Sequence, residues 1–335
     1  MNYSEARQFI EGLAPRGIEP GLETITRLCA LAGDPQLDIK AVHIAGTNGK
    51  GSTGAFIESI LMSAGYSVCR FSSPAVGGHL EMFTFNGKPV SEEDYSDCIT
   101  NLLPSIKQLE AEGFFPTSFE AETAAAFMMF SKLAPDYSII ECGMGGRLDC
   151  TNVLGSPAVS VITSISLDHT AFLGGSISDI AREKAGIIKH SCPVVTVSQP
   201  AAAAKLIADT CETMSAPLCT AEDIRNTVFS EALTTFDLED MHSLKIKLKG
   251  TFQPQNAAAA AKACMLLGID ESAIRRGLLS AQWGYRFERI GRYILDGAHN
   301  PAAARELVRS IDTYLKGHTV FICGVFRDKD HKTIA

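Results

Sequence analysis

One glycine-rich run combines the residue types that phosphate chemistry requires. The run Gly46–Ser52 reads GTNGKGS, follows the apolar segment Val42–Ala45 and precedes a segment with helical spacing. In such a turn, backbone N–H groups converge on phosphate oxygens, the helix N-terminus adds favourable partial charge, and a lysine such as Lys50 reaches the terminal phosphates. The strict Walker pattern is not met, because Ile44 stands where its first glycine belongs and Gly51 separates the lysine from the serine. The run predicts a phosphate-binding loop, with a simple glycine-dependent turn as the alternative.

Two charged residues further along the chain suit a nucleotide site. Glu141 follows the predicted strand Tyr137–Ile140, and open α/β sheets bind ligands at the carboxyl ends of their strands. Since Mg²⁺ prefers oxygen ligands, Glu141 is a candidate metal ligand, with an ion pair to Arg147 as the alternative. Lys184 lies in the helical stretch Ser178–Ile188, where a solvated lysine is the ordinary expectation.

The elements that position these residues follow an alternating pattern. Short β-rich runs alternate with helix-period segments, which predicts a doubly wound α/β fold with a parallel sheet and helices on both faces. The runs are almost continuously apolar, as expected of strands that are covered on both sides. The predicted strands are Ala41–Ala45, Ser67–Phe71, Tyr137–Ile140, Val159–Ser164 and Val194–Val197.

The last third of the chain departs from this alternation. Between Cys219 and Lys249, the short runs 227–229, 234–238 and 244–248 predict a small antiparallel region. An alanine-rich helix is expected over Asn256–Leu267. A new strand-helix-strand unit then begins, with strands at Tyr293–Leu295 and Thr319–Cys323 around a helix over residues 301–315. We expect domains at 1–288 and 289–335. Because two strands rarely stand alone, the second domain is either cut short or leans on the first.

Composition excludes several classes of protein. The chain has 335 residues, 46% of them hydrophobic and 20% charged, which is typical of a folded globular protein of two domains. Its net charge of −8 argues against nucleic acid as a partner. The ten cysteines contain no C-x-x-C pair, so reduced thiols are expected. The sequence shows neither a signal peptide nor a membrane-spanning run, so we expect a cytoplasmic protein that binds no membrane.

Several motifs together resemble one family. The loop Gly46–Ser52 resembles that of the Mur ligase superfamily, and its G-K-G-S form is similar to folylpolyglutamate synthase and dihydrofolate synthase. The resemblance covers essentially the whole chain and implies a P-loop, Mur-ligase-like, mostly parallel sheet followed by the start of a second, Rossmann-like domain. The other motifs that carry it are Ser72–Pro74, Ser118–Glu120, Glu141–Asn152, Leu167–Thr170, Glu183–Ile187, Gln253–Asn256, Arg286–Glu288 and Asp296–Pro301.

The resemblance implies a role for each matched residue. In similar proteins the lysine that matches Lys184 is carbamylated, and Lys50, Lys184 and His169 are the implied catalytic residues. The implied metal ligands are Ser73, Glu141 and His169. Nucleotide contacts are implied for Asn48, Gly49, Lys50, Gly51, Ser52, Asn256, Arg286 and Asp296, and folate contacts for Thr117, Ser118, Phe119, Glu120, Leu148, Asp149 and Cys150.

Three of these residues could instead have purely structural roles, and two segments differ from the family's motifs. His169 could cap or pack, Asn256 could cap its helix, and Phe119 could belong to the core. Family members commonly carry histidine and arginine where this chain has Ala75 and Gly78. The run Trp283–Arg286 likewise differs from the family's W-P-G-R.

The implied reaction is a ligation that consumes ATP and requires Mg²⁺. The γ-phosphate of ATP passes to a carboxylate, and an amine then attacks the acyl-phosphate. The resemblance implies dihydropteroate or a tetrahydrofolate as the acid and L-glutamate as the amine. We expect the protein to be a monomer. The alternatives are a Mur-type ligase for a peptidoglycan precursor and a truncated nucleotide-binding module without ligase activity.

Overall fold

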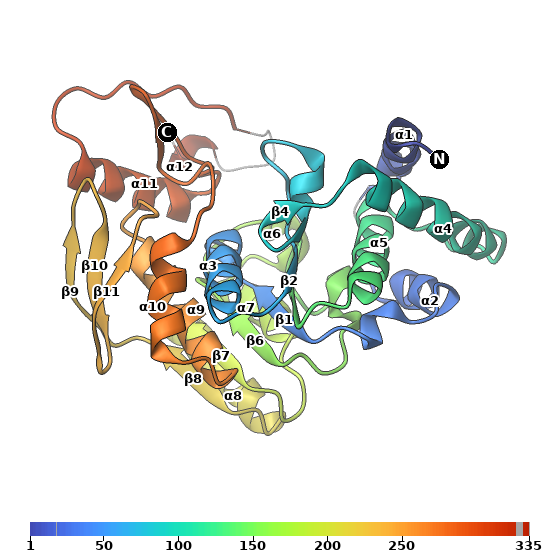
Figure 1. Ribbon diagram of the computed structural model, residues 1–335, viewed down its shortest axis with the longest axis horizontal. Helices are drawn as coiled ribbons and strands as arrows, with labels where there is room; N and C mark the ends of the chain where they lie inside the picture. The colour runs from blue at the N-terminus through green and yellow to red at the C-terminus, as the bar shows by residue number, and fades with distance from the viewer. Residues whose placement is uncertain (18, 326–330, 335) are drawn as a thin grey trace.

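An eight-stranded sheet lies at the centre of the computed structural model, which describes residues 1–17, 19–325 and 331–334 (Figure 1). The strand order is β4-β3-β2-β5-β1-β6-β7-β8, with parallel pairing from β2 to β8 and antiparallel pairing of β3 and β4 at one edge. The strands are β1 Ala41–Ala45, β2 Val68–Phe71, β3 Phe83–Phe85, β4 Lys88–Pro89, β5 Tyr137–Glu141, β6 Val159–Ile162, β7 Val194–Val197 and β8 Leu218–Ala221. The predicted doubly wound, mostly parallel sheet is therefore confirmed.

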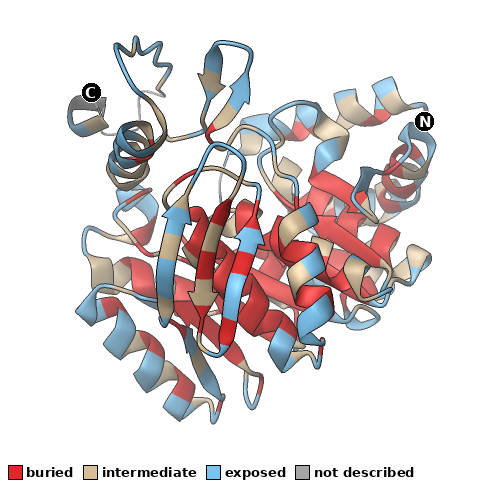
Figure 2. Ribbon diagram, turned by 60° about the vertical axis from the view of Figure 1, so that its left-hand side comes forward, coloured by how far each residue is buried: buried red, intermediate tan, exposed pale blue. Residues whose placement is uncertain are grey.

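Helices cover both faces of this sheet. On one face lie α3, α9 and α10, and on the other α1, α2, α4 and α5 cover one half while α7 and α8 cover the other. Figure 2 shows the buried sheet between these layers. The helices are α1 Tyr3–Leu13, α2 Glu23–Leu31, α3 Lys50–Ser63, α4 Glu92–Ala111, α5 Ser118–Leu133, α6 Thr170–Leu173, α7 Ile177–Ala185, α8 Ala201–Thr213, α9 Gln253–Leu266, α10 Glu271–Ser280, α11 Pro301–Tyr314 and α12 His331–Ile334, with short 3₁₀ turns at Ala14–Arg16, Pro35–Leu37, His79–Met82 and Cys150–Val153.

The central strand β1 explains why the predicted strands read as continuous apolar runs. Its five residues are all buried, and successive side chains point to opposite faces. Val42 and Ile44 join the core beneath α3 and α9. Ala41 and Ala45 face the opposite layer. A strand covered on both sides has no place for exposed polar residues.

Alanine side chains allow α9 to pack closely on the sheet. The five residues Ala257–Ala261 are fully buried in the core that also contains α3 and β6. Alanine has the highest helix propensity and only one carbon beyond Cα. The sequence therefore forms a helix that can lie close to its neighbours on every side.

The predicted antiparallel region is also confirmed. Strands β9 Ile224–Phe229, β10 Thr234–Leu238 and β11 Met241–Ile246 form a separate three-stranded sheet in the order β11-β10-β9. The chain later forms a hairpin from β12 Glu288–Ile290 and β13 Tyr293–Leu295, followed by α11. Helix α11 contacts the small sheet through Tyr314, whose hydroxyl lies 2.9 Å from Thr234 Oγ1.

One predicted element was wrong. The run Thr319–Cys323 is not a strand, although its apolar residues suggest one. A strand needs a hydrogen-bonding neighbour, and within the described ranges β13 pairs only with β12. Ile322 is 94% exposed, so the run is not buried either. The composition of this segment favours a β-strand, but a strand forms only where a neighbouring strand supplies hydrogen-bonding partners. The last residues of the predicted second domain, 326–330 and 335, lie outside the described residues.

No helix in the described part of the chain is long and apolar enough to cross a membrane. None of the ten cysteines forms a disulfide bond.

Candidate active site

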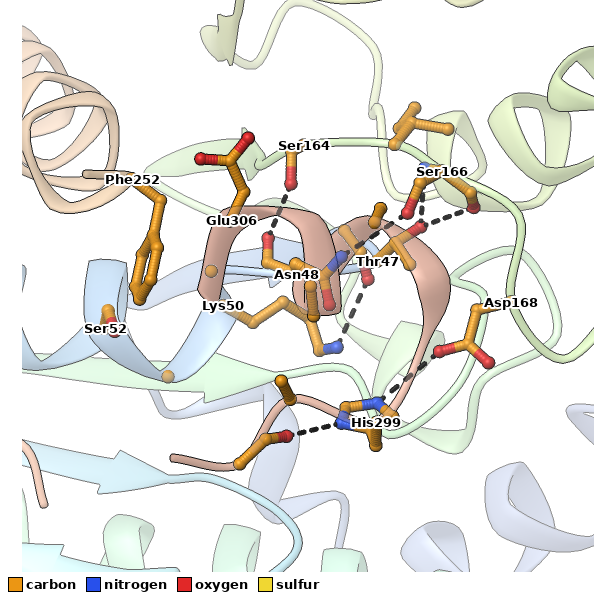
Figure 3. Close-up of a pocket in the computed structure, with 18 of the residues that line it drawn as sticks. Thr47, Asn48, Lys50, Ser52, Ser164, Ser166, Asp168, Phe252, His299 and Glu306 are labelled. Carbon is orange, nitrogen blue, oxygen red and sulfur yellow. Dashed lines mark hydrogen bonds and ion pairs between the residues drawn. The ribbon is translucent and has the colours of Figure 1, made fainter. Parts of the chain in front are cut away.

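A cavity of about 610 Å³ lies at the carboxyl edge of the parallel strands. It is bounded by the phosphate loop after β1, by residues that follow β5 and β6, and by the first turns of α11 (Figure 3). Twelve residues singled out from the sequence line it: Asn48, Gly49, Lys50, Gly51, Ser52, Ser73, Glu141, His169, Lys184, Asn256, Arg286 and Asp296. The structure thus brings the whole expected nucleotide and metal set to one place.

The phosphate loop has the conformation that its glycines permit. Gly49 has φ +91° at the N-cap of α3, a left-handed region that side chains other than glycine rarely adopt. A Cβ at Gly49 would also collide with the side chain of Asn256, and one at Gly51 would lie 2.8 Å from the ring of Trp283. The loop is anchored to the next strand because Thr47 N donates to Ser164 O at 2.8 Å. The first N–H groups of α3 have no carbonyl partner within the helix, so they can face an anion.

Lys184 is buried, contrary to the ordinary expectation of a solvated lysine. Only 3% of the residue is exposed, and its Nζ donates to Gly46 O at 2.8 Å. Lys50 Nζ donates to the same carbonyl oxygen at 3.2 Å. Burial, together with the nearby charge of Lys50, lowers the pKa of Lys184 to about 7. A substantial fraction of the amine is therefore neutral and nucleophilic at neutral pH.

Glu141 is a buried carboxylate that faces the cavity. It makes no hydrogen bond or ion pair with the described residues, and burial raises its pKa although Lys50, Arg70 and Arg286 oppose the rise. The alternative of an ion pair with Arg147 was wrong, because Arg147 binds Glu183 at 2.8 Å. A buried carboxylate without a protein partner is costly unless something positive binds it.

The other two candidate metal ligands line the same cavity. Ser73 precedes a cis peptide bond to Pro74. His169 occupies the N-cap position of the short helix α6 in a left-handed conformation, but its side chain caps nothing there. The oxygens of Ser73 and Glu141 are the kind of ligand that Mg²⁺ prefers, whereas the imidazole nitrogen of His169 is not.

Nucleotide candidates outside the loop are fixed by their own hydrogen bonds. Asn256 is not a helix cap, since α9 begins at Gln253. Its Nδ2 donates to Gln253 Oε1 at 3.1 Å, and Gln253 Nε2 donates in turn to Ser52 Oγ at 3.3 Å. The carboxylate of Asp296 accepts from Phe287 N and Ala298 N, both at 2.8 Å. The Asp296 bonds close the segment around the hairpin β12–β13 on itself, whereas the bonds of Asn256 and Gln253 tie α9 to the phosphate loop.

The expected folate residues lie elsewhere. None of the seven lines the large cavity. Thr117 and Glu120 form the capping box of α5, Asp149 caps the turn that follows it, and Cys150 lies within hydrogen-bonding distance of Thr123. Ser118 lines a second cavity, of about 460 Å³, beside α1.

Phe119 is a half-buried residue that packs against the hydrophobic core and borders the site. Its ring stacks on Phe71 with centroids 5.8 Å apart. A Cβ at Gly143, which lines the large cavity, would lie 2.5 Å from Phe119 Cε1. The ring therefore forms part of the wall behind the cavity.

Sequence reasoning missed several residues that complete the site. Two serines after β6, Ser164 and Ser166, hold the loop through Thr47 and Asn48. His299 faces Asp168, with Nε2 3.5 Å from Oδ2 (Figure 3). Ser164 ended a predicted strand and His299 stood in the motif Asp296–Pro301, whereas Ser166 belonged to no motif; none of these positions reveals the residue's partner in the folded chain. Glu306 and Arg309 of α11 also line the cavity, and no local pattern distinguishes them from surface charges.

Comparison with known proteins shows the same architecture in one family. Residues 44–264 match the Mur ligase middle domain. The chain is 36% identical to the dihydrofolate synthase/folylpolyglutamate synthase of Bacillus subtilis, over 99% of this chain and 81% of that protein.

Two solved structures resemble the fold over most of its length. A Mycobacterium tuberculosis folylpolyglutamate synthase complexed with ADP has a TM-score of 0.90 and 27% identity, and covers 99% of this chain and 78% of that one. A folylpolyglutamate synthase complexed with AMPPCP and folate has a TM-score of 0.88 and 29% identity, over 93% and 80% of the two chains. The chain therefore belongs to the folylpolyglutamate synthase/dihydrofolate synthase family within the Mur ligases, and the members of this family are ATP-dependent glutamate ligases.

Proposed function

We propose that this chain joins L-glutamate to a folate-type carboxylate, either dihydropteroate or a tetrahydrofolate, at the expense of ATP. The observation that carries the proposal is that one cavity gathers a phosphate loop, the buried carboxylate of Glu141, the buried amine of Lys184 and the cations of Lys50 and Arg286. Relatives named for both substrates, and a solved relative complexed with AMPPCP and folate, support the choice of acid.

The loop would bind the phosphates of ATP. The N–H groups of Gly49–Ser52 and the ammonium of Lys50 lie where they can neutralise charge on a transferred phosphoryl group, whereas the N–H of Asn48 donates to Ser164 O at 3.4 Å. Asn256, Arg286 and Asp296 would contact the rest of the nucleotide. Such groups are already fixed by the fold, so little reorganisation is needed when charge develops.

Ser73, Glu141 and His169 would hold Mg²⁺. When bound, the cation would offset the negative charge of the phosphates. Glu141 contributes a carboxylate that has no competing partner in the described chain. The lowered pKa of Lys184 supports its modification by CO₂, which reacts only with the neutral amine.

The acid would be activated as an acyl-phosphate, with its carboxylate oxygen forming the new bond to the γ-phosphorus while ADP leaves. The amine of glutamate would then attack the acyl carbon and release phosphate. The cavity is bordered by α11, which would exclude water from the acyl-phosphate. Folate contacts through Thr117–Glu120 and Leu148–Cys150 remain part of the proposal.

Three further features complete the proposed picture. Residues 289–335 would belong to a second domain, whose boundary with residues 1–288 falls within β12. The unpaired state of all ten cysteines supports a reducing compartment such as the cytoplasm. We expect a monomer.

The test supplies the purified protein with ATP, Mg²⁺, L-glutamate and either dihydropteroate or a tetrahydrofolate. We expect ADP, phosphate and glutamylated product in equal amounts, measured by mass spectrometry. Lys50→Met should lower kcat by about a hundredfold or more. Lys205→Met is the matched control, because the Lys205 side chain is 76% exposed on α8.

Other outcomes separate the alternatives. Product from a UDP-sugar peptide precursor, with none from either pteroate, would support a peptidoglycan ligase. Nucleotide binding without phosphate release above background would leave a binding module and contradict the ligase proposal.

A further inference from the structure

Asn300 is a buried amide whose hydrogen-bonding capacity is fully used. The residue is 1% exposed and lies at the N-cap of α11. Its Nδ2 donates to Asn48 Oδ1 and to Asp168 Oδ2, each at 2.9 Å. Its Oδ1 accepts from Asn48 Nδ2 at 3.2 Å and from Ala303 N at 2.9 Å. An asparagine amide has two donors and two acceptor sites, so no other side chain could satisfy this set unchanged.

These bonds join three segments that lie far apart in the sequence. Asn48 belongs to the phosphate loop, Asp168 follows β6, and Asn300 begins α11. Figure 3 shows Asn48 and Asp168 at the cavity, with His299 reaching Asp168 from the segment that leads into α11. The two asparagine amides bind each other reciprocally, so each fixes the orientation of the other.

The far end of α11 is attached separately. Ser310 Oγ accepts from Thr251 N at 3.0 Å, and Glu306 Oε2 accepts from Thr251 Oγ1 at 3.2 Å. Only the Asn300 bonds therefore tie this helix directly to the phosphate loop among the hydrogen bonds of the described residues. The side chains of α11 that line the cavity, such as Glu306 and Arg309, are positioned when the helix sits in this place.

We propose that Asn300 is a positioning residue that couples nucleotide binding in the phosphate loop to the seating of α11 over the cavity. When α11 is seated, Asn300 orients the side chain of Asn48 through the paired amide bonds. When a nucleotide orders the phosphate loop, Asn48 is fixed and holds Asn300, and therefore the start of α11, in place. Coupling of this kind is reciprocal. If bound nucleotide stabilises the seated position of α11 by some factor, the seated helix raises the affinity for nucleotide by the same factor. The inference rests on the proposed nucleotide site.

The test separates this coupling from the capping of α11. Asn300→Ser keeps a strong N-cap residue but is too short to reach Asn48 or Asp168. Asn300→Asp keeps the cap and the size, but it replaces the donor to Asp168 with a second carboxylate. Hydrogen exchange of the α11 amides is measured with and without a non-hydrolysable ATP analogue, and nucleotide affinity is measured by the fluorescence of Trp283, the only tryptophan in the chain.

In the native protein the analogue should slow exchange in α11 by about fivefold or more. In both variants this response should disappear, and the dissociation constant of the analogue should rise by the same factor. If Asn300 only capped α11, its substitution would change the exchange rates of the α11 amides by the same factor with and without nucleotide. An unchanged nucleotide response in both variants, or no response in a native protein that binds the analogue, would overturn the coupling alone. A native protein that does not bind the analogue would overturn the proposed function as well.

Discussion

Replacing Lys184 by methionine should change how the stability of the protein depends on pH. The side chain is 3% exposed, and its amine shares the Gly46 carbonyl with Lys50. Burial and the second cation lower the pKa of Lys184 from 10.5 to about 7 in the folded protein. Methionine keeps a similar apolar length and removes the ionisable group.

The size of the effect follows from the two pKa values. Between pH 7 and 10.5 the unfolded chain holds the Lys184 proton and the folded chain has released it. Because the unfolded state then binds more protons, the free energy of unfolding rises with pH, by up to about 1.4 kcal/mol per pH unit. From pH 7 to 9 the native protein should gain about 2 kcal/mol relative to Lys184→Met, whereas from pH 6 to 7 it should gain less than about 0.5 kcal/mol.

Urea unfolding of both proteins at pH 6, 7, 8 and 9 measures this difference. Subtracting the two curves cancels the groups that they share, and bicarbonate is excluded because carbamylation would replace the amine with an anion. Lys205→Met provides the baseline for replacing an exposed lysine. A difference between native protein and Lys184→Met that stays flat from pH 6 to 9 would refute the burial of an ionisable amine at this position.

Three other substitutions test separate parts of the structure. Arg70→Met should lower the free energy of unfolding by about 3 kcal/mol, because it leaves Glu58 buried without its 2.8 Å partner; a loss below about 1 kcal/mol in urea unfolding would contradict this. Glu141→Gln should reduce ligation by about a hundredfold while Tm does not fall, and the expectation fails if activity persists in a kinetic assay or if calorimetry shows unfolding. Gly49→Ala should weaken nucleotide binding about tenfold, since a side chain there meets Asn256 at φ +91°; equal affinity by Trp283 fluorescence would count against the loop conformation.

The framework of the fold could be predicted from the sequence because its signals are local. The first and last residues of β1 and β7 were predicted correctly, because a continuous apolar run between turn residues is typical of a strand that is covered on both faces of the sheet. The placement of the phosphate loop followed from the same context. Glu141 could be placed at the cavity because the end of a parallel strand fixes its position.

What could not be predicted depends on distant partners. The burial of Lys184 arises from the approach of α7 to the loop after β1, which no local pattern records. Asn300 resembles an ordinary N-cap in sequence, and its bonds to Asn48 appear only when the chain is folded. The segment Thr319–Cys323 had the composition of a strand but no partner among the described residues.

Transfer of isotopic oxygen tests the central claim most directly. The 335-residue protein is incubated with ATP, Mg²⁺, L-glutamate and an acid substrate whose reacting carboxylate carries oxygen-18. If the carboxylate is phosphorylated before the amine attacks, each phosphate released should carry one labelled oxygen, with one glutamylated product formed for each ADP. Glutamylated product accompanied by unlabelled phosphate, or no phosphate release at all, would contradict the account.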